Sequence, residues 1–295
     1  MTSTTRAADG TSVCPICGTP SARRGPRRFL LCSDCDLLFA ADMRAGDADW
    51  YGRTWIYTRR PAATPPSLAA IESNWAWDAF LRELPVSKGT LLDVGCGQGD
   101  LLYAARLRGL EVEGVDFQPE LVRIARECYG LNASCRDIWE MIEDRRRFDV
   151  VTAFEVVEHV ERPVEFLRAL GSIGRYVAVS VPCAERQPAF FARGFDDPPH
   201  HLTIWTPAAL QRAFDLAGLR TVTLRGDSYQ PVHFGAYLGS LFGGNYPFGR
   251  HVRGAMRRLG TALGRFVRPR REGAFTLLAV AEGNAAVGQA GEEAA

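Results

Sequence analysis

Short apolar runs and helical patterns alternate along most of the chain. The apolar runs lie at residues 91–94, 112–115, 148–154 and 176–181. The stretches between them with apolar residues at helical spacing lie at 101–108, 120–129 and 163–170. Such alternation is typical of a parallel β-sheet with helices on both faces, so the pattern predicts an α/β fold.

Further elements are predicted on either side of this pattern. Residues 67–84 have helical spacing, and Ser67 is well placed as the N-cap. A second helix is expected over 206–217, where Thr-Pro opens the pattern. Apolar stretches at 220–224 and 274–281 predict two more strands. No internal repeat is visible.

Length and composition limit the classes of protein. A chain of 295 residues can hold one full-sized catalytic domain and a small appendage. Its 46% hydrophobic and 23% charged content is that of a soluble globular protein. With a net charge of +1, the chain as a whole gives no electrostatic reason to expect binding to nucleic acid or to an acidic membrane. Residues 1–10 lack a signal-peptide core and 228–249 are broken by polar residues, so we expect a cytoplasmic protein without a transmembrane segment.

Four of the eight cysteines have the spacing of a metal site. Cys14 and Cys17 form one C-x-x-C pair, and Cys32 and Cys35 form another after fourteen intervening residues. Two such pairs place four thiolates around a tetrahedral Zn²⁺, which predicts a structural zinc ribbon rather than a redox pair or a coincidence. The other cysteines are expected to be buried small hydrophobes; they are Cys96, Cys128, Cys135 and Cys183.

A glycine-rich turn follows the strand at 91–94. Gly95, Gly97 and Gly99 lack side chains, so the backbone can approach a ligand beside the start of the next helix. Asp93 precedes the turn. Asp116 ends the following strand, where its carboxylate can accept hydrogen bonds from both hydroxyls of a ribose. The glycine spacing differs from the dinucleotide fingerprint, and no Gly-Lys-Ser/Thr follows, so a nucleoside triphosphate loop is excluded.

From residue 90 to 283 the chain resembles the class I S-adenosylmethionine-dependent methyltransferases, and in particular the ubiquinone-pathway O-methyltransferase group. Four motifs carry the resemblance, at 93–99, at 116–117, at 137–138 and at 148–155. The resemblance implies a Rossmann-like sheet of seven strands with the last strand antiparallel. It also implies S-adenosylmethionine (SAM) as cofactor. The implied cofactor-binding residues are Asp93, Gly95, Cys96, Gly97, Asp116, Phe117, Asp137, Ile138 and Phe154.

Candidate catalytic groups follow the strand at 148–154. Glu155, Glu158 and His159 have the spacing that gathers two carboxylates and an imidazole on one side of a helical turn. His200 and His201 add two imidazoles before the helix at 206–217. Carboxylates and imidazoles together can hold a divalent ion that lowers the pKa of an acceptor hydroxyl.

These motifs also resemble two methyltransferase groups. Small-RNA 2′-O-methyltransferases use a similar E-x-x-E-H and a later histidine four residues before a tryptophan, and His201 and Trp205 keep that spacing. This resemblance implies Glu155, Glu158, His159 and His201 as ligands of Mg²⁺ or another divalent ion. The ubiquinone-pathway enzymes carry a similar E-x-x-E-H, and E-H-V also occurs in the superfamily without a metal. Three hypotheses stay open: metal-assisted transfer, metal-free base catalysis by a histidine, and a purely orienting role. The predicted catalytic residues are His159, His201 and Glu155.

A long insertion separates the last two predicted strands. Residues 228–272 begin with an aromatic and glycine-rich half, and eight arginines without an acidic residue follow between 250 and 271. In the resembling family this region commonly covers the acceptor pocket, so a lid is the favoured interpretation. A solvated basic helix is the alternative, and contact with an anionic acceptor is a sharper hypothesis.

The predicted organisation has four parts: a zinc ribbon at 1–45, an aromatic connector with a capping helix at 46–88, a methyltransferase domain at 89–282, and a disordered tail at 283–295. The predicted function is O-methylation of a small molecule, such as a sugar, glycan or natural-product intermediate, in a bacterial biosynthetic pathway. One alternative is a metal-assisted RNA methyltransferase, which is favoured by the arginines of the insertion and by those between the two cysteine pairs, at 23, 24, 27 and 28, and is disfavoured by the net charge. Another is a non-catalytic scaffold that binds partners through the ribbon. The sequence does not indicate an oligomeric state.

Overall fold

The computed structural model describes most of the chain. The described residues are 12–20, 24–25, 28–47, 50–51, 64–185, 197–227, 249–264 and 274–285, with the single residues 238 and 266. Within these residues, no helix combines the length and the apolar character needed to cross a bilayer.

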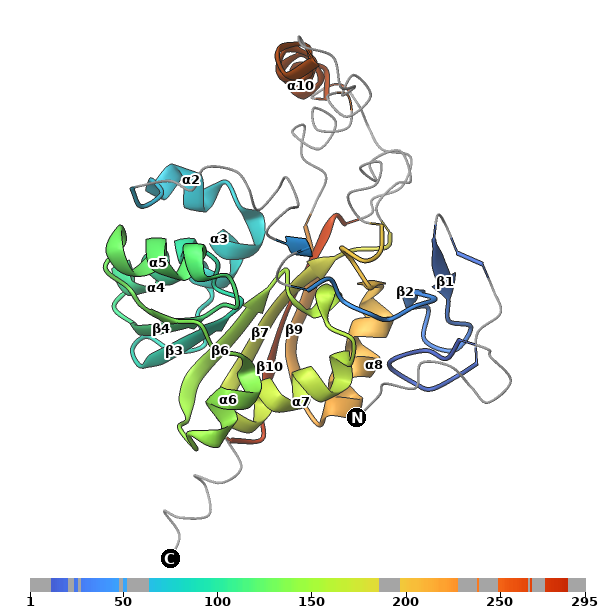
Figure 1. Cartoon of the computed structure of the whole chain (residues 1–295), viewed down its shortest axis with the longest axis horizontal. Helices are drawn as coiled ribbons and strands as arrows, with labels where there is room; N and C mark the ends of the chain where they lie inside the picture. The colour runs from blue at the N-terminus through green and yellow to red at the C-terminus, as the bar shows by residue number, and fades with distance from the viewer. Residues whose placement is uncertain are drawn as a thin grey trace, which may run out of the picture.

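A seven-stranded sheet runs through the centre of the molecule (Figure 1). From one edge to the other its strands are β5 (Asn132–Ser134), β4 (Glu111–Val115), β3 (Thr90–Val94), β6 (Phe148–Phe154), β7 (Gly174–Pro182), β10 (Thr276–Glu282) and β9 (Arg220–Gly226). Strand β10 is antiparallel to both of its neighbours, whereas β5, β4, β3, β6 and β7 pair in parallel. The predicted α/β sheet with an antiparallel last strand is confirmed.

Helices cover both faces of this sheet, because successive residues of a strand point to opposite sides. Leu91 and Val150 pack with one group of helices, and Leu92 and Val151 pack with the other. The first group is α2 (Leu68–Glu72), α3 (Trp75–Arg82), α4 (Asp100–Leu107) and α5 (Pro119–Glu127). The second is α6 (Ile138–Glu143), α7 (Pro163–Ile173) and α8 (Pro207–Ala217).

The helix predicted over residues 67–84 is two helices in the structure. Ser67 is the N-cap of α2, as predicted, and accepts a hydrogen bond from the backbone N–H of Ala70. Asn74 then caps α3 by accepting from the N–H groups of Ala76 and Trp77. An asparagine side chain that satisfies the first N–H groups of a helix favours a new helix start. The apolar spacing continues across the break, which is why the sequence pattern indicated one helix.

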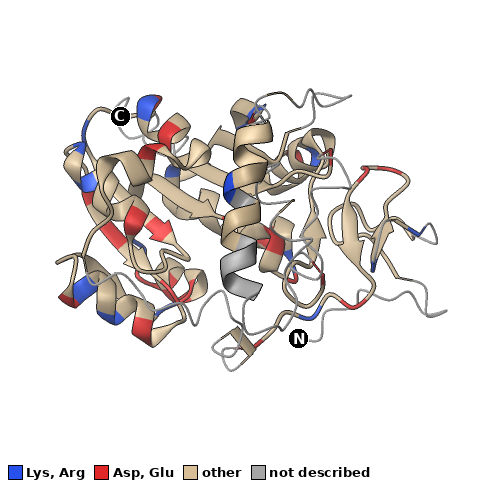
Figure 2. Ribbon diagram, turned by 90° about the horizontal axis from the view of Figure 1, so that it is seen from above, with Lys and Arg blue, Asp and Glu red and all other residues tan. Residues whose placement is uncertain are grey.

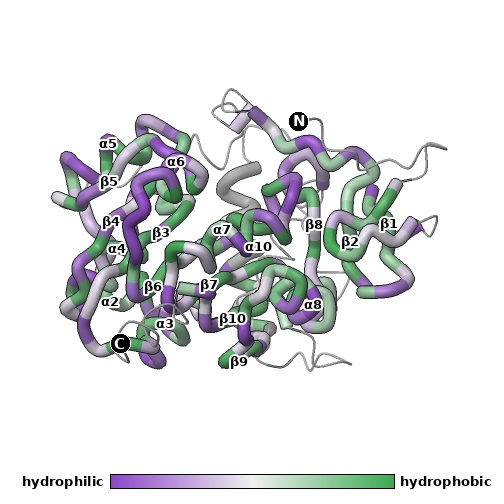
Figure 3. Tube along the Cα trace, turned by 90° about the horizontal axis from the view of Figure 1, so that it is seen from below, coloured by the Kyte–Doolittle hydropathy of each residue, from purple (hydrophilic) through white to green (hydrophobic). Residues whose placement is uncertain are grey.

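The N-terminal segment forms a small three-stranded sheet with a distant part of the chain. Strand β1 (Phe29–Leu31) pairs antiparallel with β2 (Leu38–Ala40), and β2 pairs antiparallel with β8 (Thr203–Ile204). Figure 3 shows β8 between the central sheet and β2. The predicted ribbon therefore shares its sheet with a segment that directly follows His200 and His201.

Much of the predicted insertion lies outside the described residues. Within 228–272 the structure describes Leu238, helix α10 (Gly249–Gly264) and Phe266, and the lid hypothesis remains a proposal. Residues 52–63 of the predicted connector and residues 286–295 of the predicted tail also lie outside the described part.

Basic and acidic residues are interspersed over the described helices and loops (Figure 2). On α5, for example, Arg123 lies 2.8 Å from a carboxylate oxygen of Glu120 and 2.5 Å from one of Glu127. Arg136 similarly lies 2.6 Å from Asp144. Both arginines therefore have acidic partners close by on the surface.

Candidate active site

A cavity of about 410 Å³ lies at the carboxyl ends of β3, β4 and β6. This is the edge of a parallel sheet where open α/β folds bind their ligands, and the volume is in the range of small-molecule sites. The predicted site residues on its lining are Gly95, Gly97, Asp116, Phe117, Asp137, Ile138, Glu155 and His159.

The floor of the cavity is the glycine turn between β3 and α4. Gly95 has φ of +78°, and a Cβ atom added there would lie 2.5 Å from Cγ2 of Val156. Gly97 also has a positive φ, of +56°, and its N–H donates to the carboxylate of Asp116 over 2.9 Å. The N–H of Gln118 donates to the other Asp116 oxygen over 2.8 Å. The turn thus brings backbone and a carboxylate to the cavity without intervening side chains.

Two buried carboxylates lie beside this floor. Asp93 accepts a hydrogen bond of 2.6 Å from the hydroxyl of Thr152, and burial raises the pKa of Asp93 to about 7 against the effect of that bond. Burial also raises the pKa of Asp116, while the N–H groups of Gln118 and Gly97 act in the opposite direction. Desolvated carboxylates of this kind favour a ligand that is cationic or rich in hydroxyl and amine donors.

Aromatic and apolar side chains form one end of the cavity. Phe117 and Trp139 line it, although 51% and 46% of their respective surfaces are exposed. Ile138 is buried at the start of α6, and Asp137 is the N-cap of that helix in a capping box with Glu140. Exposed rings beside a cavity offer a flat apolar surface on which a heteroaromatic ring can stack.

Three predicted cofactor-binding residues are not on the cavity lining: Asp93, which is buried directly before the glycine turn, Cys96 and Phe154. The thiol of Cys96 is buried, and its sulfur lies 2.7 Å from where a Cβ of Gly114 would be. Phe154 packs into the core with its ring centroid 5.3 Å from that of Phe80. The structure therefore gives the side chains of Cys96 and Phe154 packing contacts, while the residues on either side of Cys96 line the cavity.

Three histidines lie together at one side of the cavity, where His159 is on the lining and His200 and His201 are buried behind it and do not line it. His159 lies at the end of the 3-10 helix η1 (Val157–His159), and its ring centroid is 5.0 Å from that of His200 and 4.9 Å from that of His201. One ring nitrogen from each of the three lies within 4.8 Å of the other two. Burial lowers the pKa of His159 well below 6.5, and the other two imidazoles lower it further. A group of this composition can exchange protons with a ligand or hold a divalent ion.

The two glutamates of the predicted set have different surroundings. Glu155 is exposed on the cavity wall with φ of +57°, and it accepts a hydrogen bond of 2.8 Å from the hydroxyl of Ser180. Glu158 is fully buried, and its carboxylate lies 3.8 Å from Nε2 of His159. The residues with metal-ligand spacing in this part of the described chain are the three histidines, without Glu155 or Glu158.

The segment after the ribbon supplies residues that sequence analysis did not assign to the site. Ala45, Gly46 and Tyr51 line the cavity, and the hydroxyl of Tyr51 lies 3.2 Å from Nδ1 of His159. Burial raises the pKa of Tyr51 to about 12, so this phenol is protonated at neutral pH. The aromatic richness of the connector was the available signal, but its contact with His159 depends on the fold.

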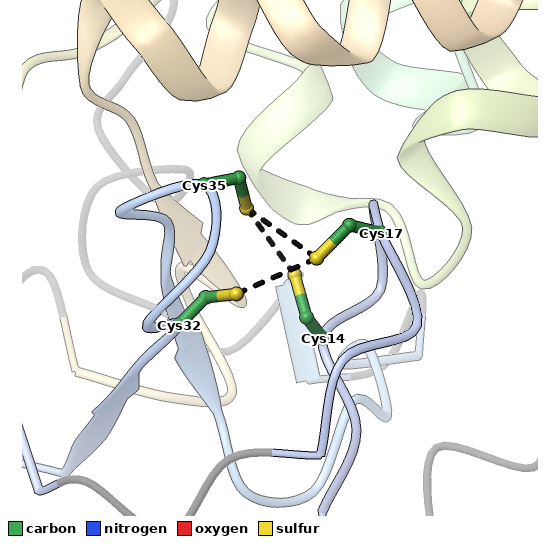
Figure 4. A group of neighbouring side chains, drawn as sticks. All are labelled: Cys14, Cys17, Cys32 and Cys35. Carbon is green, nitrogen blue, oxygen red and sulfur yellow. Dashed lines mark hydrogen bonds between the residues drawn. The ribbon is translucent and has the colours of Figure 1, made fainter.

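The four N-terminal cysteines converge on one point (Figure 4). The sulfur–sulfur distances are 3.6 Å for Cys14 and Cys35, 3.5 Å for Cys17 and Cys32, and 3.8 Å for Cys17 and Cys35. Sulfurs about 2.3 Å from a central Zn²⁺ form a tetrahedron with edges of about 3.8 Å, whereas disulfide sulfurs are about 2 Å apart. The cluster thus fits a tetrahedral metal ion.

Comparison with known proteins identifies the family. Residues 72–224, just over half of the chain, match a family model described as a methyltransferase domain. The chain belongs to this methyltransferase family.

The methyltransferase has curated relatives that align over about half of its length. A ubiquinone biosynthesis O-methyltransferase from Methylobacterium nodulans is 31% identical over 172 residues, which cover 51% of this chain and 68% of that protein. Another protein of the same name, from Xanthomonas oryzae pv. oryzae, is 30% identical over 191 residues, which cover 57% of this chain and 78% of that protein. A crystal structure of coclaurine N-methyltransferase bound to N-methylheliamine and SAH is similar in fold alone, with a TM-score of 0.50, 14% identity and coverage of 82% and 79%.

The cavity of the methyltransferase fits its cofactor, SAM. SAM carries a positively charged sulfur, a ribose and an adenine ring. The buried carboxylate of Asp116 on the lining suits the hydroxyls and the charge, the glycine floor leaves room for close approach, and Phe117 offers a ring for stacking. The protein is therefore a SAM-dependent methyltransferase, and the scaffold alternative is set aside.

Proposed function

We propose that the methyltransferase transfers the SAM methyl group to a hydroxyl oxygen of a small molecule in a biosynthetic pathway, with His159 as the general base. The observation that carries the proposal is a neutral imidazole on the wall of the cofactor cavity, beside the end of β6. The names of the two O-methyltransferase relatives support oxygen as the acceptor atom.

The hydrogen bond of His159 supports its role as a base. Nδ1 of His159 lies 2.5 Å from the carbonyl oxygen of His200, and a carbonyl can only accept. The proton of the neutral ring therefore sits on Nδ1, and Nε2 carries a lone pair. The low pKa of His159 keeps this form populated at neutral pH.

The neighbouring groups suit a proton transfer to Nε2. Bound SAM supplies an electrophilic methyl group on sulfur. Nε2 takes the proton of the acceptor hydroxyl, and the buried carboxylate of Glu158, 3.8 Å away, stabilises the imidazolium that results. Tyr51 and His201 fix the ring between them, and Glu155 on the cavity wall can orient the acceptor by a hydrogen bond.

A second candidate mechanism uses a divalent ion at the histidine cluster. The proximity of one nitrogen from each of His159, His200 and His201 favours it, and imidazole ligands suit Zn²⁺, Fe²⁺ or Ni²⁺ better than Mg²⁺. The ligand set differs from the expected one, because His200 joins it and Glu155 bonds Ser180. If turnover survives exhaustive chelation unchanged, this candidate fails and the metal-free base remains.

We also propose that Cys14, Cys17, Cys32 and Cys35 hold a structural Zn²⁺. All four corners of the tetrahedron are protein sulfurs, which leaves no open position for an acceptor. Elemental analysis of the purified full chain should give at least one zinc per chain, and loss of this zinc in Cys17→Ser would assign it to the ribbon.

The acceptor class is tested by a labelled-methyl screen. Cell-extract fractions, isolated small molecules and RNA are offered separately to the full-length protein with methyl-labelled SAM. Labelling of a small molecule on oxygen supports the proposal, whereas labelling of RNA alone supports the arginine-based alternative. Repeating the assay at rising salt tests an anionic acceptor, because such binding weakens steeply as ionic strength increases.

A further inference from the structure

The four-cysteine ribbon is joined to the histidine cluster through backbone pairing. In the register of β2 and β8, Leu38 is opposite Ile204 and Phe39 is opposite Thr203. The N–H of Ala40 extends the pairing by donating to the carbonyl of Leu202 over 2.8 Å. Strand β8 begins two residues after His201, so the ribbon holds the segment that carries two of the three imidazoles.

The same segment is tied to the main sheet on its other side. The N–H of Leu202 donates to the carbonyl of Glu158 over 2.7 Å, and that of Trp205 donates to the carbonyl of Pro182 over 3.1 Å. The N–H of Ala184 donates to Trp205 over 2.7 Å. Residues 200–205 therefore lie as a bridge between the ribbon and the ends of η1 and β7.

Side chains of residues 200–205 also pack in the same hydrophobic core as the four-cysteine cluster. Cys14, Cys32 and Cys35 belong to the same hydrophobic core as Leu202 and Trp205. Cys32, Leu202 and Trp205 are fully buried in this core. Close-packed interiors transmit displacements, so spreading of the four sulfurs would move the side chains beneath β8.

A second connection runs from the ribbon to the cavity along the chain. The N–H of Ala45 donates to the carboxylate of Glu161 over 3.1 Å, which fixes the chain beside the end of η1. Six residues further on, Tyr51 reaches Nδ1 of His159 with its hydroxyl. The ribbon thus borders the histidine cluster through β2 and through the segment that follows it.

We propose that the four-cysteine ribbon is a positioning element of the catalytic centre: its metal-loaded form holds His200 and His201 against His159 through the pairing of β2 with β8. The proposal rests on the proposed zinc and histidine roles. The cofactor groups Asp93, Gly95, Gly97 and Asp116 lie on the central sheet and its turns. Loss of the ribbon metal is therefore expected to disturb the histidines more than SAM binding.

The test follows the histidines directly and needs no acceptor. Full-length protein is labelled in its histidine rings, and the imidazole NMR signals are recorded with saturating SAM, together with zinc content and calorimetric SAM affinity. Cys14→Ser removes one corner of the cluster, and Cys128→Ser is the matched control because Cys128 lies at the end of α5, outside it. We expect Cys14→Ser to lose zinc and to shift the signals of His159, His200 and His201, while Cys128→Ser changes neither.

A second pair of variants tests the strand pairing without touching a metal ligand. Leu38 packs with Phe29 and Ile204 in a small separate cluster. Leu38→Ala is expected to keep its zinc and still shift the His200 and His201 signals, and Leu38→Ile is expected to restore them. Displacement of a positioned group by about 1 Å can reduce turnover about 100-fold, so once an acceptor is known kcat should fall far more than SAM affinity.

The outcomes separate this proposal from the proposed function. Unchanged histidine signals in zinc-free Cys14→Ser would overturn the positioning role and leave His159 as a candidate base. If Cys14→Ser does not fold, Leu38→Ala decides: unchanged signals overturn the proposal and shifted signals support it. Full turnover by His159→Gln would instead remove the base, whatever the ribbon does to the histidine signals.

Discussion

Nδ1 of His159 lies 2.5 Å from the backbone carbonyl oxygen of His200, so the segment that carries two imidazoles also fixes the tautomer of the third. This contact links residues on η1 and before β8, which are far apart along the chain. A ring held in this way keeps its Nε2 lone pair in one orientation, which favours proton transfer over mere packing.

Replacement of His159 tests the general base. His159→Gln is expected to lower turnover of an identified acceptor by about 100-fold or more, because a positioned base contributes about 10²–10⁴-fold. SAM affinity should stay unchanged by calorimetry, since the carboxylates predicted to bind SAM lie on β3 and directly after β4. His251→Gln is the matched control, because His251 belongs to α10 and not to η1 or to the segment before β8. Equal losses in the two variants would contradict the assignment.

Asp93 predicts a pH dependence of stability in the absence of SAM. Its folded pKa is about 7, above the unfolded value of about 3.9, so between these values the folded state binds a proton that the unfolded state lacks. The stabilisation is complete below about pH 4 and is lost as the pH rises through 7. Asp93→Asn removes this contribution. In thermal denaturation, the melting temperature of the variant relative to that of the wild type should therefore rise from pH 5 to pH 8. A constant difference would contradict the shifted pKa.

Two glycines of the turn allow a matched comparison. Both positions have a positive φ, so alanine is strained at either one. At Gly95 the added Cβ would also lie 2.5 Å from Val156, whereas at Gly97 it would lie in open space. The left-handed conformation costs a non-glycine residue about 1–2 kcal/mol. We therefore expect Gly95→Ala to reduce the melting temperature more than Gly97→Ala. Equal melting temperatures would show that Val156 moves aside at no cost.

Asp116 should be required for cofactor affinity. Its carboxylate accepts from the N–H groups of Gly97 and Gln118 and so orders the turn as well as the cavity. Hydrogen bonds to charged groups contribute about 1.5–3 kcal/mol, so Asp116→Asn is expected to weaken SAM binding about 10- to 100-fold by calorimetry. Asp215→Asn on α8 is the control, and it should bind SAM normally.

Metal removal should destabilise the fold beyond the ribbon. Cys32 and Cys35 share a core with side chains of α8 such as Phe214. Zinc binding supplies folding free energy to small metal sites, so chelation is expected to lower the melting temperature of the whole chain in a single transition. Calorimetry with and without a chelator measures this. Two separate transitions, with the second unchanged, would mean that the ribbon folds independently.

The inner strands β3, β6, β7 and β10 could be predicted because most of their residues are buried on both faces of the sheet. Such strands are continuous apolar runs, as in Phe148–Phe154, and no distant contact is needed to recognise them. Strand β5 was not predicted, because Asn132–Ser134 is three residues long and lacks an apolar run. Strand β8 has two residues, and only its pairing with β2 makes it a strand.

The residues of the candidate site also differ in whether local sequence or tertiary contact places them there. The glycine turn and Asp116 are encoded within short motifs, so sequence alone placed them on the cavity. Tyr51 and His200 reach the site through tertiary contacts with His159, which no local spacing indicates. Cys96 and Phe154 stand next to lining residues, but the alternation of a strand or the twist of a turn directs their side chains into the core.

The pairing of Leu38 with Ile204 also sets an order of events during synthesis. Strand β2 leaves the ribosome long before β8, and at about 5–20 residues per second its outer edge waits roughly 10–30 s for a partner. An unpaired strand edge invites pairing with other chains. Early metal capture by the four cysteines would keep this edge short and rigid during the wait, and nascent chains made under zinc limitation should aggregate before the catalytic fold is complete.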